Sequence, residues 1–202
     1  WIEDCSAAMQ NILLAASGKG LLADVLLYPA VGRAVGIIPP PRDDEELRKG
    51  ITGRLRDGAS VILFDNVTSL TSPVLSAALT AAWWDDRVLG KSETIRMPVR
   101  CAWVATANNG TLSTDVARRS IRIRLDPKTD RPWLRTGFRH PDLRSWVAAH
   151  RGELVRAAAV LVRAWVAAGK PCPSCALLGS FESWTRVVGG ILQNAGISGF
   201  LA

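Results

Sequence analysis

Residues 11 to 20 read NILLAASGKG, and this stretch decides the fold class. The apolar run Asn11 to Ala16 has the length of a buried β-strand and stops at Ser-Gly-Lys-Gly. Apolar residues then recur at the spacing of one helix face, at Leu21, Leu22, Val25 and Leu26. The sequence therefore predicts a strand, a tight loop and a helix. Lys19 would begin that helix, at the end where anions bind favourably. A plain turn between strand and helix is the alternative.

Further apolar segments of strand length follow this unit. They are Ala34 to Ile38, Ser60 to Phe64, Val99 to Ala105 and Ile121 to Leu125. Continuous apolar runs such as SVILF at 60–64 are typical of strands that are covered on both faces. Helical patterns separate most of these segments. This order predicts an α/β fold with a parallel five-stranded sheet sandwiched by helices.

The segment from 43 to 58 has the clearest helical pattern. Its first turn, 43–46, is acidic and complements the positive end of a helix. Leu47, Ile51 and Leu55 form one apolar stripe, and Gly58 stands where a helix commonly ends.

The segments between and after the predicted strands have less regular patterns, and their secondary structure is predicted from turn residues and apolar spacing. Pro73 is expected to begin a helix that runs to about Trp84, and residues 86–98 are expected to form a β-hairpin. Only helical patterns follow Pro141. We therefore expect a nucleotide-binding core over residues 1–126 and a helical lid over residues 127–202.

Composition indicates a folded globular protein, because 48% of the 202 residues are hydrophobic and 21% are charged. The longest apolar runs are interrupted by Asp24 and Arg163, which excludes a membrane span. No basic segment with an apolar stretch behind it opens the chain, so no signal peptide is expected. The four cysteines are few and scattered, which fits a reducing cytoplasm.

The net charge of +7 is concentrated in the second half of the chain. Residues 1–100 carry 11 basic and 12 acidic side chains, whereas residues 101–202 carry 14 basic and 6 acidic ones. Basic side chains gain affinity for a polyanion by displacing its counterions. The asymmetry therefore favours a nucleic-acid partner, and improved solubility is the alternative.

The loop matches the phosphate-loop pattern only in part. That pattern needs a glycine, four residues, Gly-Lys and then Ser or Thr, whose hydroxyl binds magnesium. Gly18 and Lys19 match, but Leu13 replaces the first glycine and Gly20 replaces the hydroxyl residue.

Asp65 ends the predicted strand SVILF, 46 residues after Lys19. A carboxylate at this place in such a fold positions magnesium. The next residue is Asn66, whose amide can orient a water molecule but cannot accept its proton. The alternative for Asp65 is a solvated residue at a strand end.

The order of these segments resembles that of AAA+ P-loop ATPases. The resemblance rests on the Gly-Lys pair after a strand, VILFD, WWDDRVLG, CAWVATANN and DVARRSIRIRLD, and it covers roughly residues 12 to 200. It is strongest to the replication ATPases of phages, plasmids and integrative elements. The hairpin before the CAWVATANN strand is similar to that of the minichromosome-maintenance and MoxR-like branches.

The resemblance implies a role for each matching residue. Ser17, Gly18, Lys19, Gly20 and Leu21 would bind ATP, and Asp65 would bind Mg²⁺. Asn66 and Asn108 would act at the reacting phosphate, with Asn109 as the alternative to Asn108. Arg118 or Arg119 would be an arginine finger that enters the site of a neighbouring subunit. Arg87, Lys91 and Arg96 on the hairpin would contact DNA. For Arg118 and Arg119 the alternative is two solvated arginines on a basic face, and for the hairpin it is a charged, solvent-exposed hairpin.

These implications give two functional hypotheses. The first is an ATP-dependent DNA helicase-type motor that forms a homo-oligomeric ring on single-stranded or forked DNA and works beside other replication proteins. The second is a module that binds nucleotide, or nothing, without hydrolysis and serves as a scaffold for DNA or replication partners. Cys172 and Cys175 have the spacing of metal ligands, but no second matched pair exists, so an inert loop is expected.

Overall fold

The computed structural model describes residues 11–15, 18–87, 93–125, 128–129, 131–179 and 181–201. The predicted α/β class with a parallel sheet is confirmed. Its strands are β1 (Asn11–Ala15), β2 (Ile37–Ile38), β3 (Val61–Leu70), β6 (Ala102–Leu112) and β7 (Ile121–Arg124). They pair in parallel in the order β2-β3-β6-β1-β7, so that β6 separates β1 from β3.

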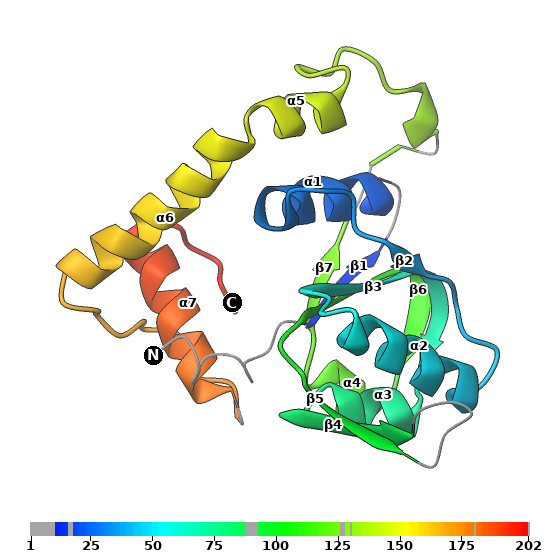
Figure 1. Cartoon of the computed structure of the whole chain (residues 1–202). Helices are drawn as coiled ribbons and strands as arrows, with labels where there is room; N and C mark the ends of the chain where they lie inside the picture. The colour runs from blue at the N-terminus through cyan, green and yellow to red at the C-terminus, as the bar shows by residue number, and fades with distance from the viewer. Residues whose placement is uncertain are drawn as a thin grey trace.

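The two faces of the sheet are covered by different helices (Figure 1). Helix α1 (Lys19–Val31) lies on one face, where Ala23 packs with Leu63 and Val104. Helices α2 (Asp44–Arg56) and α3 (Pro73–Ala78) lie on the other, over a larger core that includes the stacked rings of Phe64 and Trp103. Alternate residues of β3 therefore enter opposite cores, as the twofold period of a strand requires.

Helix α2 agrees with its prediction. The side chain of Asp43 accepts a hydrogen bond from the backbone N–H of Glu46 at 2.8 Å and caps the helix. The predicted stripe Leu47, Ile51 and Leu55 is buried. Gly58 has a φ of 66°, a left-handed conformation that glycine adopts without strain, and it follows the end of the helix.

Several predicted boundaries were wrong. The segment 34–38 forms only the two-residue edge strand β2, in which Ile37 is 53% exposed. Strands β3 and β6 both run on past their predicted ends, to Leu70 and Leu112. Helix α3 ends near Leu79 rather than at Trp84, which belongs to the next strand.

A separate antiparallel pair follows α3. Strands β4 (Trp83–Arg87) and β5 (Thr94–Pro98) pair with Trp83 opposite Pro98 and Arg87 opposite Thr94. The predicted hairpin is confirmed in these strands but begins three residues earlier, and its residues 88–92 lie outside the described part of the chain. The short helix α4 (Thr114–Ala117) connects β6 to β7.

Beyond β7 the described elements are all helical. They are the 3₁₀ turn η1 (Pro132–Leu134), α5 (Leu143–Ala149), α6 (Arg151–Ala167) and α7 (Glu182–Asn194). Figure 1 shows α5 beside α1, and α6 and α7 further from the sheet. Two hydrogen bonds from Arg144 of α5 to Asp24 of α1, at 2.7 and 2.9 Å, join the helices. None of the described helices is long and apolar enough to cross a bilayer.

Candidate functional site at the carboxyl edge of the sheet

The loop after β1 brings Lys19 to the start of α1. Gly18 precedes the helix with a φ of 87°, which a residue with a side chain rarely adopts, and its carbonyl accepts the first helical bond from Leu22 at 2.9 Å. A Cβ atom added to Gly18 or Gly20 would meet no atom within 4 Å. No described atom therefore crowds the Cβ positions of these two glycines at the start of α1.

Lys19 contacts a polar residue in the second half of β6. Its ammonium donates a hydrogen bond to Oδ1 of Asn108 at 2.9 Å, across 89 residues of sequence. The amide of Asn108 donates in turn to Oδ1 of Asn66 at 3.3 Å. The structure thus brings together three predicted site residues, from the start of α1, the middle of β6 and the middle of β3.

Asp65 joins the same group through Thr106. The hydroxyl of Thr106 donates to Oδ1 of Asp65 at 2.5 Å and accepts from the backbone N–H of Asn66 at 2.8 Å. Thr106 is fully buried, whereas Asp65 is half-buried. Sequence reasoning missed Thr106; the available signal was a hydroxyl residue inside the apolar run of CAWVATANN.

Two asparagines turn the backbone at the site. Asn66 and Asn109 have φ values of 56° and 53°, a left-handed conformation that asparagine tolerates better than most residues. The pairing of β3 with β6 shifts register between Phe64 and Val67, so Asp65 and Asn66 lie in a β-bulge. Bulges of this kind redirect side chains relative to the paired strands. Here the side chain of Asp65 contacts Thr106 and that of Asn66 contacts Asn108, both on β6.

Gly110 lies where β6 leaves little room for a side chain after the bulge. A Cβ atom on Gly110 would lie 2.9 Å from the Cβ of Ala107 and 3.4 Å from the carbonyl oxygen of Val67. A larger residue would therefore force a local shift of β6 next to Asn108, whereas its distance to β3 would be an ordinary contact. The pairing resumes beyond it, with Ser69 opposite Thr111.

The predicted finger arginines lie at the end of α4, not in the group around Lys19. The side chain of Arg118 is 63% exposed and forms an ion pair with Asp115 at 2.5 Å. Arg119 is less exposed, at 20%, and donates to the carbonyl of Asp115 at 3.0 Å. Of the two, Arg118 is the side chain that a neighbouring molecule can reach more easily.

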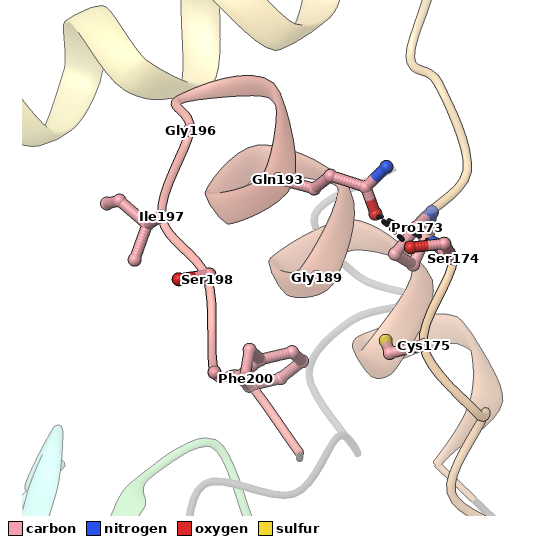
Figure 2. Close-up of a pocket in the computed structure, with 10 residues that line it drawn as sticks. Pro173, Ser174, Cys175, Gly189, Gln193, Gly196, Ile197, Ser198 and Phe200 are labelled. Atoms are coloured by element: carbon pink, nitrogen blue, oxygen red, sulfur yellow. Dashed lines mark hydrogen bonds between the residues drawn. The ribbon is translucent and has the colours of Figure 1, made fainter.

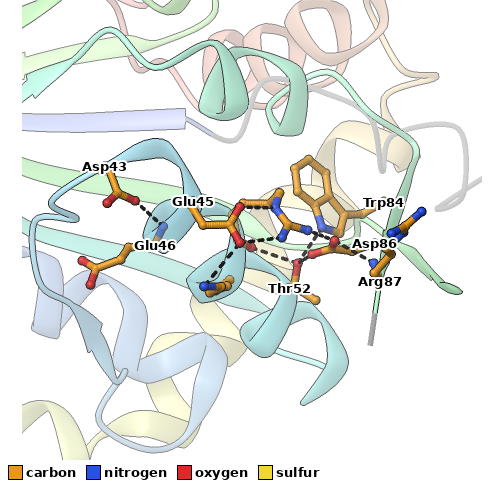
Figure 3. Close-up of polar contacts among 9 residues, drawn as sticks. Asp43, Glu45, Glu46, Thr52, Trp84, Asp86 and Arg87 are labelled. Carbon is orange, nitrogen blue, oxygen red and sulfur yellow. Dashed lines mark hydrogen bonds and ion pairs between the residues drawn. The ribbon is translucent and has the colours of Figure 1, made fainter. Parts of the chain in front are cut away.

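A polar network fixes the base of the hairpin to α2 (Figure 3). The buried carboxylate of Asp86 accepts hydrogen bonds from the hydroxyl of Thr52 and the backbone N–H of Arg87, and it pairs with Arg48. The indole N–H of Trp84 donates to the same Thr52 hydroxyl at 2.9 Å.

Arg48 also links this network to the surface of α2. Its guanidinium, with the ammonium of Lys49, lowers the pKa of Glu45 to about 2 through hydrogen bonds to the carboxylate. Glu45 raises the pKa of Arg48 in return. Asp86 at the base of the hairpin is therefore paired with Arg48 of α2, which also pairs with Glu45.

Arg87 and Arg96, two of the three predicted DNA-contacting residues, are exposed on the hairpin. Arg87 is exposed at the end of β4. The guanidinium of Arg96 lies 5.1 Å from the ring centre of Trp83, which is 49% exposed, and 3.8 Å from Asp85. Lys91 lies outside the described residues, as does Ser17 of the loop. Leu21, the last predicted loop residue, is 37% exposed in the first turn of α1.

The donor set fits magnesium only in combination with a phosphate. Mg²⁺ is usually bound by one or two carboxylates, several waters and substrate phosphates, so Asp65 alone can serve. Within the described ranges no three His, Cys, Asp or Glu side chains gather to hold a metal ion. Cys172 and Cys175 are free thiols in that part of the chain.

A cavity of about 430 Å³ lies away from this site, between α7 and the segments 173–175 and 196–200 (Figure 2). Its lining includes Gln193, whose Oε1 accepts from the N–H and the hydroxyl of Ser174 at 2.7 and 3.0 Å. The lining residues carry no charge, so this cavity does not suit a phosphate ligand.

Comparisons with known proteins give limited information. No family model matches the chain, and no curated protein matches it. Among solved structures that match, one is described as the A form apo structure of the NrS-1 C-terminal region. It has 14% sequence identity to this chain and a TM-score of 0.49, and the match covers 75% of this chain. The present chain spans about 37% of the length of that one.

Proposed function

We propose that the chain is the ATP-binding domain of an AAA+ P-loop ATPase of the DNA replication or helicase type. In this proposal it binds ATP with Mg²⁺ and couples hydrolysis to remodelling or unwinding of DNA. Residues 1–126 form the nucleotide-binding core, with the five-stranded sheet of a P-loop protein, and residues 127–202 form the lid.

One observation carries the proposal: Lys19 at the start of α1 contacts Asn108, and Asn108 contacts Asn66 beside Asp65. A cation at a helix N-terminus, a polar amide and a carboxylate are among the groups that P-loop proteins use to bind a phosphate anhydride with magnesium. They come from segments up to 89 residues apart. The strand order supports the same reading, because β6 lies between β1 and β3 and carries Asn108 to a point between Lys19 and Asp65.

Each residue has a distinct task in this proposal. The N–H groups from Ser17 to Leu21 surround the phosphates, and Lys19 neutralises their charge. Asp65 holds Mg²⁺, which supplies charge neutralisation at the phosphates when bound. Asn108 and Asn66 orient the attacking water.

The motor hypothesis also needs a second subunit and DNA. Arg118 or Arg119 would reach the nucleotide of a neighbouring protomer in a homo-oligomeric ring, and the 63% exposure of the Arg118 side chain supports that role. Arg87, Lys91 and Arg96 on the hairpin would contact single-stranded or forked DNA. Other replication proteins are further partners.

A second candidate function is a nucleotide-binding scaffold that does not hydrolyse ATP. Asn66 favours it, because an amide cannot take a proton from water. Gly20 also favours it, because the loop then lacks the hydroxyl that completes the magnesium site. Binding without turnover is the distinguishing property of this candidate.

The experiment is ATP binding and phosphate release by the purified protein with Mg²⁺, with and without single-stranded DNA. Lys19→Ala is compared with Lys49→Ala, which removes an exposed lysine from α2. DNA-stimulated turnover that is lost only in Lys19→Ala supports the motor. Binding that is lost only in Lys19→Ala, with no turnover in the parent, supports the scaffold. Absence of ATP binding in the parent protein overturns both.

A further inference from the structure

The segment between β7 and α5 exposes apolar side chains to an unusual degree. The most exposed large hydrophobic residues in the described part of the chain are Trp133, Leu134 and Phe138, at 74%, 62% and 56%. They lie within six residues of each other. Exposed aromatic rings that cluster in this way mark interaction surfaces in folded proteins.

The same segment is strongly basic. Residues 128–140 read KTDRPWLRTGFRH, with four basic side chains and one acidic one. Arg131, Arg135 and Arg139 are exposed, and no carboxylate in the described ranges forms an ion pair with them. The guanidinium of Arg135 lies 5.9 Å from the ring centre of Phe138. An apolar partner would leave these charges desolvated, whereas a polyanion with flat aromatic groups would satisfy both features.

The structure holds this segment at both ends. At its start, Arg124 of β7 is paired with Ala15 of β1, so the segment leaves the sheet at the edge where Lys19 lies. At its end, the ring of His140 stacks on Trp146 of α5 at 4.4 Å. Figure 1 shows the segment as the yellow-green chain that runs out beyond α1 before α5.

We propose that residues 131–140 form a second binding surface for single-stranded nucleic acid, separate from the hairpin. Unpaired bases stack on Trp133 and Phe138, and phosphates bind Arg131, Arg135 and Arg139. Stacking on aromatic rings beside a basic track is how proteins bind single strands without sequence preference. A duplex hides the faces of its bases, so the aromatic side chains select single strands.

This inference extends the DNA partner of the proposed function, but it does not depend on nucleotide. Binding is therefore measured with the full chain without ATP, as the fluorescence anisotropy of a labelled oligothymidylate. Loss of ATP binding in Lys19→Ala tests the nucleotide site separately. The two proposals can thus fail independently.

The test compares two double variants of the segment. Trp133→Ala with Phe138→Ala is expected to weaken single-strand binding at least about tenfold and to leave the salt dependence nearly unchanged. Arg135→Ala with Arg139→Ala is expected to lower the slope of log affinity against log salt by about 1 to 1.5. Tyrosine at both aromatic positions should retain most of the affinity, because it keeps a ring for stacking.

Matched controls lie on α6, where Arg156 and Arg163 are exposed basic residues and Val160 and Leu161 are exposed apolar ones. Alanine at either pair should change single-strand affinity less than twofold, the resolution expected of the assay. Equal losses in the control and segment variants would overturn the proposal. So would binding to phosphatidylserine vesicles that the aromatic variant loses while its DNA affinity is retained. A fall in oligomer size in the aromatic variant, again with unchanged DNA affinity, would assign the surface to a second copy of the chain.

Discussion

Asn66 is the residue on which the distinction between a motor and a scaffold depends. It follows Asp65 in the bulge, its backbone is left-handed, and its side-chain oxygen already accepts a hydrogen bond from Asn108. Aspartate tolerates the same backbone and keeps the acceptor, and it can also take a proton.

We therefore expect Asn66→Asp to raise the rate of ATP hydrolysis, by about 100-fold if a general base is the missing component. Phosphate release under saturating ATP and Mg²⁺ measures the change. Asn66→Gly is the control, because it removes the acceptor without supplying a base and tolerates the left-handed backbone. An unchanged rate in Asn66→Asp, with ATP still bound, would show that proton removal does not limit turnover.

Thr106 offers a second prediction at this scale. Its buried hydroxyl satisfies both the carboxylate of Asp65 and the N–H of Asn66. Thr106→Val keeps the shape but leaves both groups without this partner, so the free energy of unfolding should fall by about 1 to 3 kcal/mol. Urea denaturation measures it. Thr106→Ser retains the hydroxyl, so its free energy of unfolding should fall clearly less than that of Thr106→Val. An equal fall in both variants would mean that packing, not hydrogen bonding, is responsible.

Single residues of the site were predictable where a residue type is tied to one chemistry. Lys19 after a glycine and Asp65 after an apolar run could be found in this way, and the contacts among Lys19, Asn108 and Asn66 agree with that placing. Thr106 could not, because a buried threonine inside a strand is also compatible with simple packing.

At the scale of the elements, predictions succeeded where periodicity and capping agree and failed where tertiary contacts decide. Helix α2 has both its cap and its stripe in the sequence. The alanines before Trp83 favour a helix. In the structure, however, Trp84 is buried and donates a hydrogen bond to Thr52, and the residues of β4 alternate between exposed and buried as in a strand. The long continuation of β3 could not be predicted, because polar residues in the bulge interrupt its pattern.

The network at the base of the hairpin gives a prediction at this scale. Asp86→Ala removes the acceptor shared by Thr52, Arg48 and the N–H of Arg87 and leaves Arg48 without its buried partner. We expect the protein to lose about 2 to 4 kcal/mol of stability.

Thermal unfolding checks this loss, and hydrogen exchange of the β4 and β5 amides should increase. The neighbouring Asp85 has a side chain that is 58% exposed, so Asp85→Ala is the matched control and should change stability little. Equal effects of the two substitutions would contradict an anchoring role for Asp86.

In the whole molecule, α1 lies between the sheet and the C-terminal helices. It packs on the sheet through Ala23 and faces α5 across a small hollow of about 120 Å³ lined by Val25, Tyr28 and Val147. The ion pair of Asp24 with Arg144 also joins α1 to α5.

Val147 is the buried residue of α5, at 4% exposure. Val147→Ala should weaken the attachment of the C-terminal helices by about 1 to 3 kcal/mol, because it leaves space against α1. Limited proteolysis should then cut faster in the segment 128–142. Val160→Ala on the exposed face of α6 is the control, and faster cutting there as well would point to a general loss of stability.

The pairing of β3 with β6 on both sides of the bulge has a mechanical consequence. Most binding loops join the scaffold only where the flanking elements end, and their backbone does not pair with a neighbouring strand. Asp65, Asn66 and Asn108 instead lie within a span that is supported before the bulge by Phe64 opposite Ala105 and after it by Leu70 opposite Leu112. A span fixed at two ends deflects less than a free one, so a ligand would meet side chains whose positions are already set and would bind with little loss of backbone entropy.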